Sequence, residues 1–414
     1  MKKILSKLLG GVLLFSLSMS LTSCEGALDD ILGEWSRPAG IKEGTFSYAT
    51  TSQVIGITVD DFVNPITIEG DGKVTYSSSD PTIAEVDPET GVITPHKMGT
   101  VTITATITDG KKYAYETKEI SYTLKVSCPY MKWDDTAKKL VEAEPLDETT
   151  ASIMPAESEL ADAPADSKLL PAGTYIIAED MTFNKNIQLS GDVDIILCDG
   201  KTLTFNLYLF GNDGSNSYKL NIYGQSEDTG KLIVSYGIHG AKPLNVYGGQ
   251  IDLTVSGNAA LGNIDGMNVY GGKVNAVCNS SNGGSGIKMK YGATLTIYGG
   301  EVFAKGPATE TNQSGFGISG SANVVVNGGS LVAISQRNYV NSAGIYGNLT
   351  VNGGSVEVKD VNKTTGEISG DSRAAVSGTI TVGAGVSLQG KNHNTGWADI
   401  TDNTNNYQHI RTKQ

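Results

Sequence analysis

A short phrase that ends in a glycine pair recurs along the second half of the chain, and this repeat constrains the fold more than any other feature. In its clearest form, two aliphatic residues flank a polar one, as in Leu-Asn-Val-Tyr-Gly-Gly at residues 244–249. The first glycines of the seven copies lie at positions 224, 248, 271, 299, 328, 353 and 383, so the spacing is 23 to 30 residues. Self-similarity at this period indicates stacked structural repeats.

Each repeat has room for three short strands. A second alternating run follows the glycine pair, and a short Gly-Ile element comes after a polar loop. The helical period is absent, which disfavours leucine-rich and ankyrin solenoids. A propeller is disfavoured too, because each blade needs four strands in roughly 40 residues, more than a repeat of 23 to 30 residues can hold. Strand residues two apart share a face, so the aliphatic residues of successive repeats stack as one core. We therefore expect a parallel β-helix of about eight rungs over residues 169–390, right-handed by the general preference for right-handed crossovers.

Composition and charge narrow the class further. Glycine supplies 51 of the 414 residues, and glycine inside a helix costs about 1 kcal/mol relative to alanine. A mainly helical protein is therefore disfavoured, and the prediction is an all-β chain. The formal charge is −13, and only four residues are arginine. Affinity for nucleic acid comes largely from Lys and Arg on phosphates, so we expect no nucleic-acid partner.

The first 23 residues have the pattern of an export signal. Three early lysines precede an apolar stretch at 8–17, which is shorter than the roughly 20 residues that span a bilayer. The Leu-Thr-Ser-Cys run that ends at Cys24 resembles the lipobox of bacterial lipoproteins. The resemblance implies cleavage before Cys24, lipidation of that cysteine and attachment to a membrane. Residues 24–43 carry acids, glycines and one proline, and we expect a tether there.

Residues 44–126 contain short alternating runs separated by turn signals, which is typical of a β-sandwich. The stretch resembles the group 2 bacterial immunoglobulin-like (BIG2) domain, a spacer or adhesive module of bacterial surface proteins. The motifs that carry this resemblance are Tyr-Ser-Ser-Ser-Asp-Pro at 76–81, Ala-Glu-Val-Asp at 84–87, Gly-Val-Ile-Thr at 91–94 and Gly-Thr-Val-Thr-Ile at 99–103.

Two polar segments flank the predicted β-helix. Residues 127–168 are rich in acids, alanine and proline, and we expect a solvated linker with one short helix around 136–144. Residues 391–414 form a polar tail, and we expect them to cap the far end of the stack.

Cysteine spacing suggests no metal site. Besides Cys24, the chain holds Cys128, Cys198 and Cys278, an odd number that cannot pair completely within one chain. Alternation places Cys278 on the face of Val274, so we expect a buried, inert thiol there. We expect no metal and no cofactor.

The fourth position of the phrase gives the candidate binding site. Four tyrosines occupy equivalent places on successive rungs, and alternation points them outward beside polar residues at the second position. An aromatic strip next to amides suits sugar rings, whereas aromatic ladders also stabilise β-stacks without a ligand. The candidate residues are Tyr223, Tyr247, Tyr270 and Tyr298, with Asn245 and Asn268 beside them.

Catalytic signals are weak. Hydrolysis of a glycan needs paired carboxylates roughly 5 to 9.5 Å apart, but the outward acids Asp252, Glu301 and Glu357 are scattered along the repeats. The His239-Gly240 pair is similar to one motif of polygalacturonases, but its companion motifs are missing, so we interpret His239 as a loop residue. The chain is therefore predicted not to be an enzyme.

The Gly-Ile and Gly-Gly rungs resemble non-catalytic carbohydrate-binding β-helix domains of bacterial cell surfaces, which are related in fold to pectate lyases. That family often places a calcium-binding Asp before the Gly-Ile element. The calcium site does not carry over, because Tyr236, Ser285, Phe316 and Ala343 stand at those positions here.

Together, these features predict an outer-membrane lipoprotein exposed at the cell surface, similar to surface proteins of Bacteroidetes. We expect a monomer that binds a glycan or another surface polymer through its β-helix, with the immunoglobulin-like domain as a spacer. Two alternatives stay open: a lyase or hydrolase that acts on acidic glycans, and a purely structural stalk.

Overall fold

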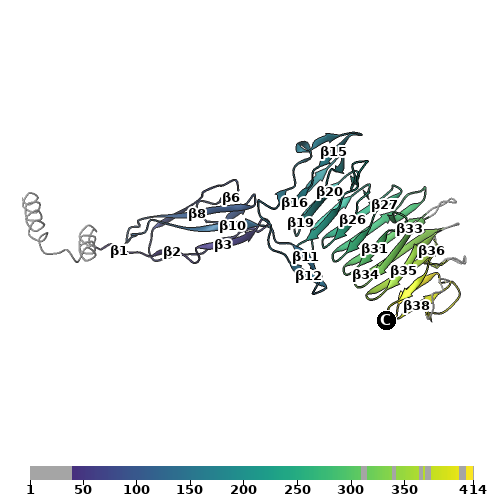
Figure 1. The fold of residues 1–414 in the computed structure, drawn as a ribbon. Helices are drawn as coiled ribbons and strands as arrows, with labels where there is room; N and C mark the ends of the chain where they lie inside the picture. The colour runs from purple at the N-terminus through teal and green to yellow at the C-terminus, as the bar shows by residue number, and fades with distance from the viewer. Residues whose placement is uncertain are drawn as a thin grey trace, which may run out of the picture.

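The computed structural model describes residues 40–308, 315–337, 342–362, 367–368, 374–400 and 407–413. The export signal, Cys24 and most of the tether lie outside the described residues. Two β-rich parts follow one another along the chain, a small sandwich and a long stack of strands (Figure 1). Among the described residues, the helical content is one 3-10 turn, η1 (Glu157–Glu159), and no helix is long and apolar enough to cross a membrane.

The first part is an immunoglobulin-like sandwich. Its main sheet has the order β3-β10-β8-β5, and shorter pairs complete the domain. Alternation in β8 places Val101, Ile103, Ala105 and Ile107 in the core, as the sequence pattern predicts. The strands are β1 (Lys42–Glu43), β2 (Phe46–Tyr48), β3 (Ser52–Gly56), β4 (Ile66–Ile68), β5 (Lys73–Ser78), β6 (Ala84–Val86), β7 (Ile93–Pro95), β8 (Gly99–Thr108), β9 (Tyr113–Ala114) and β10 (Glu119–Ser127).

The second part is a solenoid of about eight turns, in which three columns of strands run parallel to their neighbours. The first column contains β15 (Ser167–Leu170), β18 (Asn186–Leu189), β21 (Leu209–Phe210), β24 (Ile238–His239), β27 (Ala259–Ile264), β30 (Gly284–Met289) and the first halves of β33 (Gly315–Val326) and β35 (Ala343–Val351). The second column contains β13 (Ser152–Ile153), β16 (Gly173–Ile177), β19 (Val193–Leu197), β22 (Leu220–Gly224), β25 (Leu244–Val246), β28 (Met267–Val269), β31 (Thr294–Ile297), the second halves of β33 and β35, and β37 (Ile380–Val382).

The third column holds the alternating run that follows each glycine pair. Its strands are β17 (Met181–Phe183), β20 (Thr202–Phe205), β23 (Lys231–Val234), β26 (Gln250–Val255), β29 (Lys273–Cys278), β32 (Glu301–Ala308), β34 (Ser330–Arg337) and β36 (Ser355–Asn362). The three-strand repeat and the number of turns confirm the sequence prediction, and the right-handed sense stays a prediction.

The aliphatic residues of the repeated phrase stack as predicted. Leu244 pairs in register with Met267, which pairs with Leu295, and all three are fully buried. Full burial of such a side chain contributes about 1.5–3 kcal/mol. The second glycine of the pair makes the bend into the third column: Gly272 has a φ of +73°, a conformation that costs glycine little.

Both ends of the stack are closed by antiparallel strands. At the start, β14 (Ala161–Ala163) pairs antiparallel with β15. At the other end, β40 (His409–Thr412) pairs antiparallel with β36 and with β38 (Leu388–Lys391), and β39 (Ala398–Asp399) adds to β38. The Arg411 guanidinium lies 3.9 Å from the centre of the Trp397 ring. The described part of the tail therefore pairs with the last strand of the third column, and its role as a cap stays a prediction.

The segment 127–168 differs from the expected solvated linker. Its first part forms a β-hairpin of β11 (Met131–Asp134) and β12 (Lys139–Glu142), where the sequence predicted a helix around 136–144. Its last part already belongs to the solenoid, because β13 pairs with β16 and β14 with β15. The helix prediction is wrong because the segment folds back on the preceding strand as a hairpin, whose Trp133 and Leu140 side chains pack against the solenoid at Tyr270 and Gly271.

The two parts share one core at their junction. Leu124 and Val126 of the sandwich belong to the same cluster of buried side chains as Ile176 and Ile196 of the solenoid.

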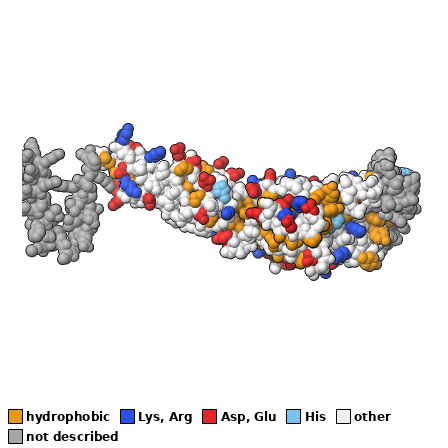
Figure 2. Space-filling model, turned by 90° about the horizontal axis from the view of Figure 1, so that it is seen from above, with side chains coloured by type: hydrophobic (Ala, Val, Ile, Leu, Met, Phe, Trp, Pro, Cys, Tyr) orange, Lys and Arg blue, Asp and Glu red, His pale blue; other side chains and the backbone are white. Residues whose placement is uncertain are grey.

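On the face shown in Figure 2, acidic and basic side chains are interspersed along both parts.

Candidate functional site

The four tyrosines of the repeated phrase form one ladder, as the spacing predicts. Ring centroids of successive residues lie 4.6, 4.8 and 4.9 Å apart, and the ring planes differ by 3 to 5°. Rings this close and this parallel must overlap face to face, because side-by-side rings would need a wider spacing. The faces that a sugar would need are therefore covered by neighbouring rings, and mainly ring edges and hydroxyls point away from the solenoid.

The β11–β12 hairpin covers this ladder. The Trp133 ring centroid lies 5.0 Å from that of Tyr270, and Tyr130 meets Tyr223 edge-on at 5.2 Å. Burial raises the pKa of Tyr270 to about 12, with smaller contributions from Tyr247 and Tyr298. Burial also raises the pKa of Tyr223 and of Tyr247. The ladder is therefore the surface on which the hairpin packs, and its rings are less exposed to solvent than the sequence analysis expected.

A second ladder, made of amides, runs beside the tyrosines. Asn268 Nδ2 donates to Asn245 Oδ1 at 2.9 Å, Asn245 donates to Asn221 at 2.7 Å, and Asn221 donates to the Asp194 carboxylate at 2.6 Å. Asn221 and Asn245 are only 9% and 8% exposed. These amides use their hydrogen bonds along the stack, which is what a structural ladder requires. A ligand-binding role for Asn245, Asn268 and the four tyrosines stays a prediction, and this geometry favours the structural alternative.

A different aromatic surface lies on the first column of the solenoid. We call Tyr208, Phe210, Tyr236 and His239 the aromatic cluster. The Tyr208 ring stacks on Phe210 at 5.2 Å and contacts Tyr236 at 5.4 Å and His239 at 5.1 Å. Tyr208 and Phe210 flank the buried Leu209, so strand alternation turns both rings outward. Tyr236 is 47% exposed and presents ring surface to solvent.

His239 lies on β24, not in a loop as the sequence analysis expected. Its Nε2 is 3.2 Å from the Ala259 carbonyl oxygen. Burial lowers the pKa of His239, and the nearby positive charge of Lys288 lowers it further. The neutral ring therefore carries its proton on Nε2 to reach that oxygen, which leaves Nδ1 as an acceptor. The His239 ring packs over Gly262 on the next rung, where a side chain would clash with it.

A polar groove continues the same face. We call the polar groove the hollow of about 280 Å³ whose lining includes the side chains of Asn258, Asn282, Ser285, Lys288, Phe316 and Ser319. Its wall is anchored by the buried hydroxyl of Ser285, which is 2.7 Å from the Ser319 hydroxyl. The Tyr208 hydroxyl reaches the loop at Gly257, next to Asn258, so the aromatic cluster and the groove adjoin.

Sequence reasoning missed this face, although a signal for it was present. The positions before the Gly-Ile elements hold Tyr236 and Phe316, and they were considered only as places where a calcium-binding Asp was missing. In the structure, Tyr236 belongs to the aromatic cluster, and Phe316 lines the groove and contacts Tyr346 at 5.2 Å. The signal that was overlooked is that two of these positions hold an aromatic residue.

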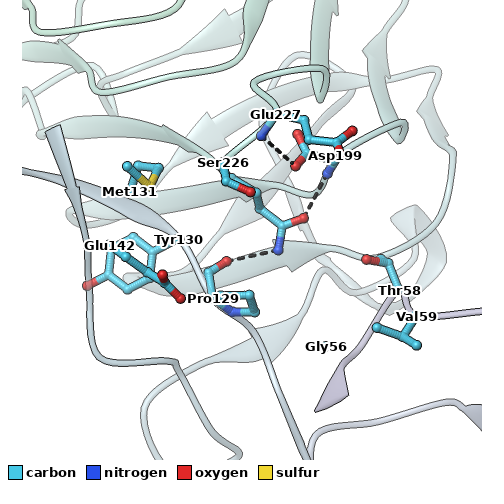
Figure 3. A pocket seen from close by; sticks show the side chains of 11 residues that line it. Gly56, Thr58, Val59, Pro129, Tyr130, Met131, Glu142, Asp199, Ser226 and Glu227 are labelled. Atoms are coloured by element: carbon cyan, nitrogen blue, oxygen red, sulfur yellow. Dashed lines mark hydrogen bonds between the residues drawn. The ribbon is translucent and has the colours of Figure 1, made fainter. Parts of the chain in front are cut away.

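A crevice of about 360 Å³ lies at the junction of the two parts (Figure 3). Its polar groups are largely committed to structure. The Gln225 amide donates to the Pro129 carbonyl oxygen at 2.8 Å and accepts from the Asp199 backbone N–H at 2.8 Å. The Asp199 carboxylate in turn accepts from the backbone N–H groups of Glu227 and Thr229. These bonds tie the linker to the solenoid. Within the described part of the chain, no group of three or more His, Cys, Asp and Glu could hold a metal ion.

The outward acids of the third column do not form a hydrolytic pair. Asp252 and Glu357 lie in the same row but four rungs apart, roughly 19 Å at the usual strand spacing. Glu301 forms an ion pair with Lys273 at 3.2 Å, and Glu357 lies 2.9 Å from His409. The separation of Asp252 and Glu357 is well beyond the 5 to 9.5 Å that glycoside hydrolysis uses.

The fold defines a chain with an immunoglobulin-like domain followed by a β-solenoid. Residues 45–117 match the model of the bacterial Ig-like domain (group 2) family, which agrees with the resemblance drawn from the sequence motifs. No curated protein matches the chain.

Proposed function

We propose that the protein is a lipid-anchored surface protein that binds carbohydrate without cleaving it. The glycan lies along the first column of the solenoid, from the aromatic cluster to the polar groove. The observation that carries this proposal is the half-exposed Tyr236 ring, which sits in an aromatic cluster that adjoins a groove lined by amides, hydroxyls and one lysine. The tyrosine ladder, which is covered by the hairpin, is the second candidate surface.

The chemistry of this face suits a sugar chain. Aromatic side chains offer a large rigid apolar surface, which matches the C–H face of a pyranose. Binding sites commonly combine such surfaces with a few placed polar groups that fix orientation. Here the amides of Asn258 and Asn282 and the ammonium of Lys288 supply those groups. Lys288 also favours a glycan that carries carboxylate or sulfate.

The non-catalytic part of the proposal rests on the carboxylates. The pair that shares a row, Asp252 and Glu357, is too widely separated to act together, and Glu301 and Glu357 are engaged by basic neighbours. A polysaccharide panel tests this part directly. We expect no depolymerisation, and release of reducing ends or unsaturated products would establish the enzyme alternative.

The anchoring part rests on the Leu-Thr-Ser-Cys run and on the family of the first domain. Lipidation at Cys24 would place the sandwich between the membrane and the solenoid, as a spacer that holds the binding face away from the lipid surface. Replacing Cys24→Ala should release the protein from membranes. Unchanged partitioning of this variant would refute the lipid anchor.

Binding is tested with the full mature chain on a glycan array, followed by affinity measurement on the retained glycans. Tyr208→Ala and Tyr236→Ala should each weaken binding about 5- to 30-fold, which corresponds to about 1–2 kcal/mol. Tyr291→Ala is the matched control, because Tyr291 is 90% exposed but belongs to neither the cluster nor the groove. If Tyr208→Ala and Tyr236→Ala bind as tightly as the wild-type protein and Tyr291→Ala, this face is rejected as the binding site. If the wild-type protein is retained on no glycan, a structural stalk is favoured.

A further inference from the structure

Two cysteines from different parts of the molecule meet at the junction. Cys128 directly follows β10, the last strand of the sandwich, and Cys198 directly follows β19 of the solenoid. Their Sγ atoms are 4.0 Å apart, although 70 residues separate them in the sequence. Both are 0% exposed and belong to the apolar cluster that the two parts share.

The surroundings hold the two thiols together. The Cys128 N–H donates to the Leu146 carbonyl oxygen at 3.0 Å, and the Leu146 N–H donates back to Cys128 at 2.9 Å, which fixes the Cys128 backbone. Cys198 continues a strand whose residues pair in register with both neighbouring rungs. A disulfide has an S–S distance of about 2.05 Å, so the two Sγ atoms would need to approach by about 2 Å. Side-chain rotation can supply a movement of that size.

We propose that Cys128 and Cys198 form a disulfide that joins the immunoglobulin-like domain to the solenoid. The proposal rests on the proposed export of the chain, because disulfides form and persist in oxidising compartments outside the cytoplasm. Of the three cysteines that follow Cys24, one is then left unpaired. Cys278 lies on β29, with its Sγ 3.0 Å from the Gly257 carbonyl oxygen, and stays a free thiol.

The reaction needs an oxidant that itself carries a disulfide, such as an envelope thiol–disulfide oxidoreductase or oxidised glutathione. One cysteine thiolate attacks the oxidant's disulfide and forms a mixed disulfide. The first attack breaks the oxidant's S–S bond and leaves one of its sulfurs as a thiolate. The second cysteine thiolate then attacks the mixed disulfide, forms the Cys128–Cys198 disulfide and releases the oxidant's other sulfur. An oxidoreductase therefore leaves as a dithiol, and oxidised glutathione leaves as two glutathione thiols. Two protons and two electrons leave the protein. The step belongs to folding, because the hydrogen bond with Cys198 and burial raise the pKa of the Cys128 thiol once the junction has closed.

The test counts thiols in the full chain purified from the cell envelope without reductant. The sample is denatured in N-ethylmaleimide, and intact mass gives the number of adducts. We expect one labelled thiol, Cys278, and three after prior reduction. Proteolysis without reduction should yield one linked peptide pair that contains Cys128 and Cys198. Three labelled thiols in unreduced protein from the envelope would overturn the proposal.

Further measurements test which cysteines are paired and whether the chain is exported. In Cys278→Ser the unreduced protein should show no labelled thiol, whereas in Cys198→Ser it should show two. Refolding of reduced protein with oxidised glutathione should restore the linked peptide, and its absence would also overturn the disulfide. Cell fractionation of the same sample isolates the premise: protein found inside the cell with free thiols refutes the proposed location.

Discussion

The Trp133 indole lies across two rungs of the solenoid, with its ring centroid 5.0 Å from that of Tyr270 and 5.6 Å from that of Tyr298. Trp133 lies on β11, in the segment that connects the sandwich to the solenoid. This segment is therefore a packed part of the structure. It shields a row of rings that would otherwise form an exposed aromatic stripe.

Replacing Trp133→Ala should detach the hairpin. The change removes two ring contacts and leaves the ladder open to water, and we expect a loss of about 1–3 kcal/mol. Limited proteolysis followed by mass spectrometry should show faster cleavage within residues 131–142. Lys132→Ala is the control, because Lys132 is exposed on the same strand and should change stability by less than about 0.5 kcal/mol. If both variants resist proteolysis equally well, the ladder is not the surface that holds the hairpin.

The Tyr270→Ala variant distinguishes the two interpretations of the ladder. If the ladder is structural, removal of a ring stacked on both sides should lower the free energy of unfolding by about 1–3 kcal/mol and leave glycan retention unchanged. Thermal unfolding and glycan affinity are measured on the same sample. A variant that keeps its melting temperature but loses the glycan would restore the ladder as the binding site.

The buried amide ladder should be sensitive to interruption. Asn245→Ala removes the donor to Asn221 and the acceptor for Asn268, and an unsatisfied buried polar group costs about 1–3 kcal/mol. Asn352→Ala is a matched control, because Asn352 donates to Asn327 at 2.9 Å in an exposed pair. Denaturant unfolding should show a clearly larger effect for the buried site. Comparable losses in the two variants would show that burial is not what matters.

Alkaline pH should loosen the hairpin. Burial holds the pKa of Tyr270 at about 12 in the folded protein, above the ordinary value of about 10 in an unfolded chain. The folded state therefore binds this proton more tightly. Its contribution to stability is complete below pH about 10 and is lost as the pH rises towards 12.

The measurement is thermal unfolding between pH 8 and 12, together with ultraviolet absorbance of the phenolates. We expect the melting temperature to fall in the same pH range in which the late-ionising tyrosines titrate. The Tyr270→Ala variant should show a smaller pH-dependent fall than wild type. A fall of the same size in both proteins would assign the effect to other groups.

Much of the fold could be predicted because it repeats. The phrase around Leu244 recurs often enough to give the strand register, the inward row of aliphatic residues and the alignment of Tyr247 with Tyr270. The motif at 76–81 similarly indicated the sandwich. Repetition averages out the ambiguity that a single short apolar run would carry.

The cover over the ladder could not be predicted in the same way. Trp133 and Leu140 are not part of any repeat. They lie in a segment whose acids and prolines suggest exposure to solvent. Their partner surface, including the space above Gly271 that the Leu140 side chain occupies, exists only after the solenoid has formed. The aromatic cluster has the same origin, because Tyr208 and Tyr236 meet only when successive rungs stack.

The strand β3 runs parallel to β10, with Ser52 beside Thr123 and Gly56 beside Ser127. The chain enters β3 at one end of this pair and leaves β10 at the opposite end. Once the short β1 and β2 have been released, a pull on the two ends of the domain loads all five register pairs in shear. Hydrogen bonds sheared together break at a higher force than bonds unzipped one by one. A molecule stretched between a membrane and a bound polymer would therefore bear mechanical tension along this one pair of strands.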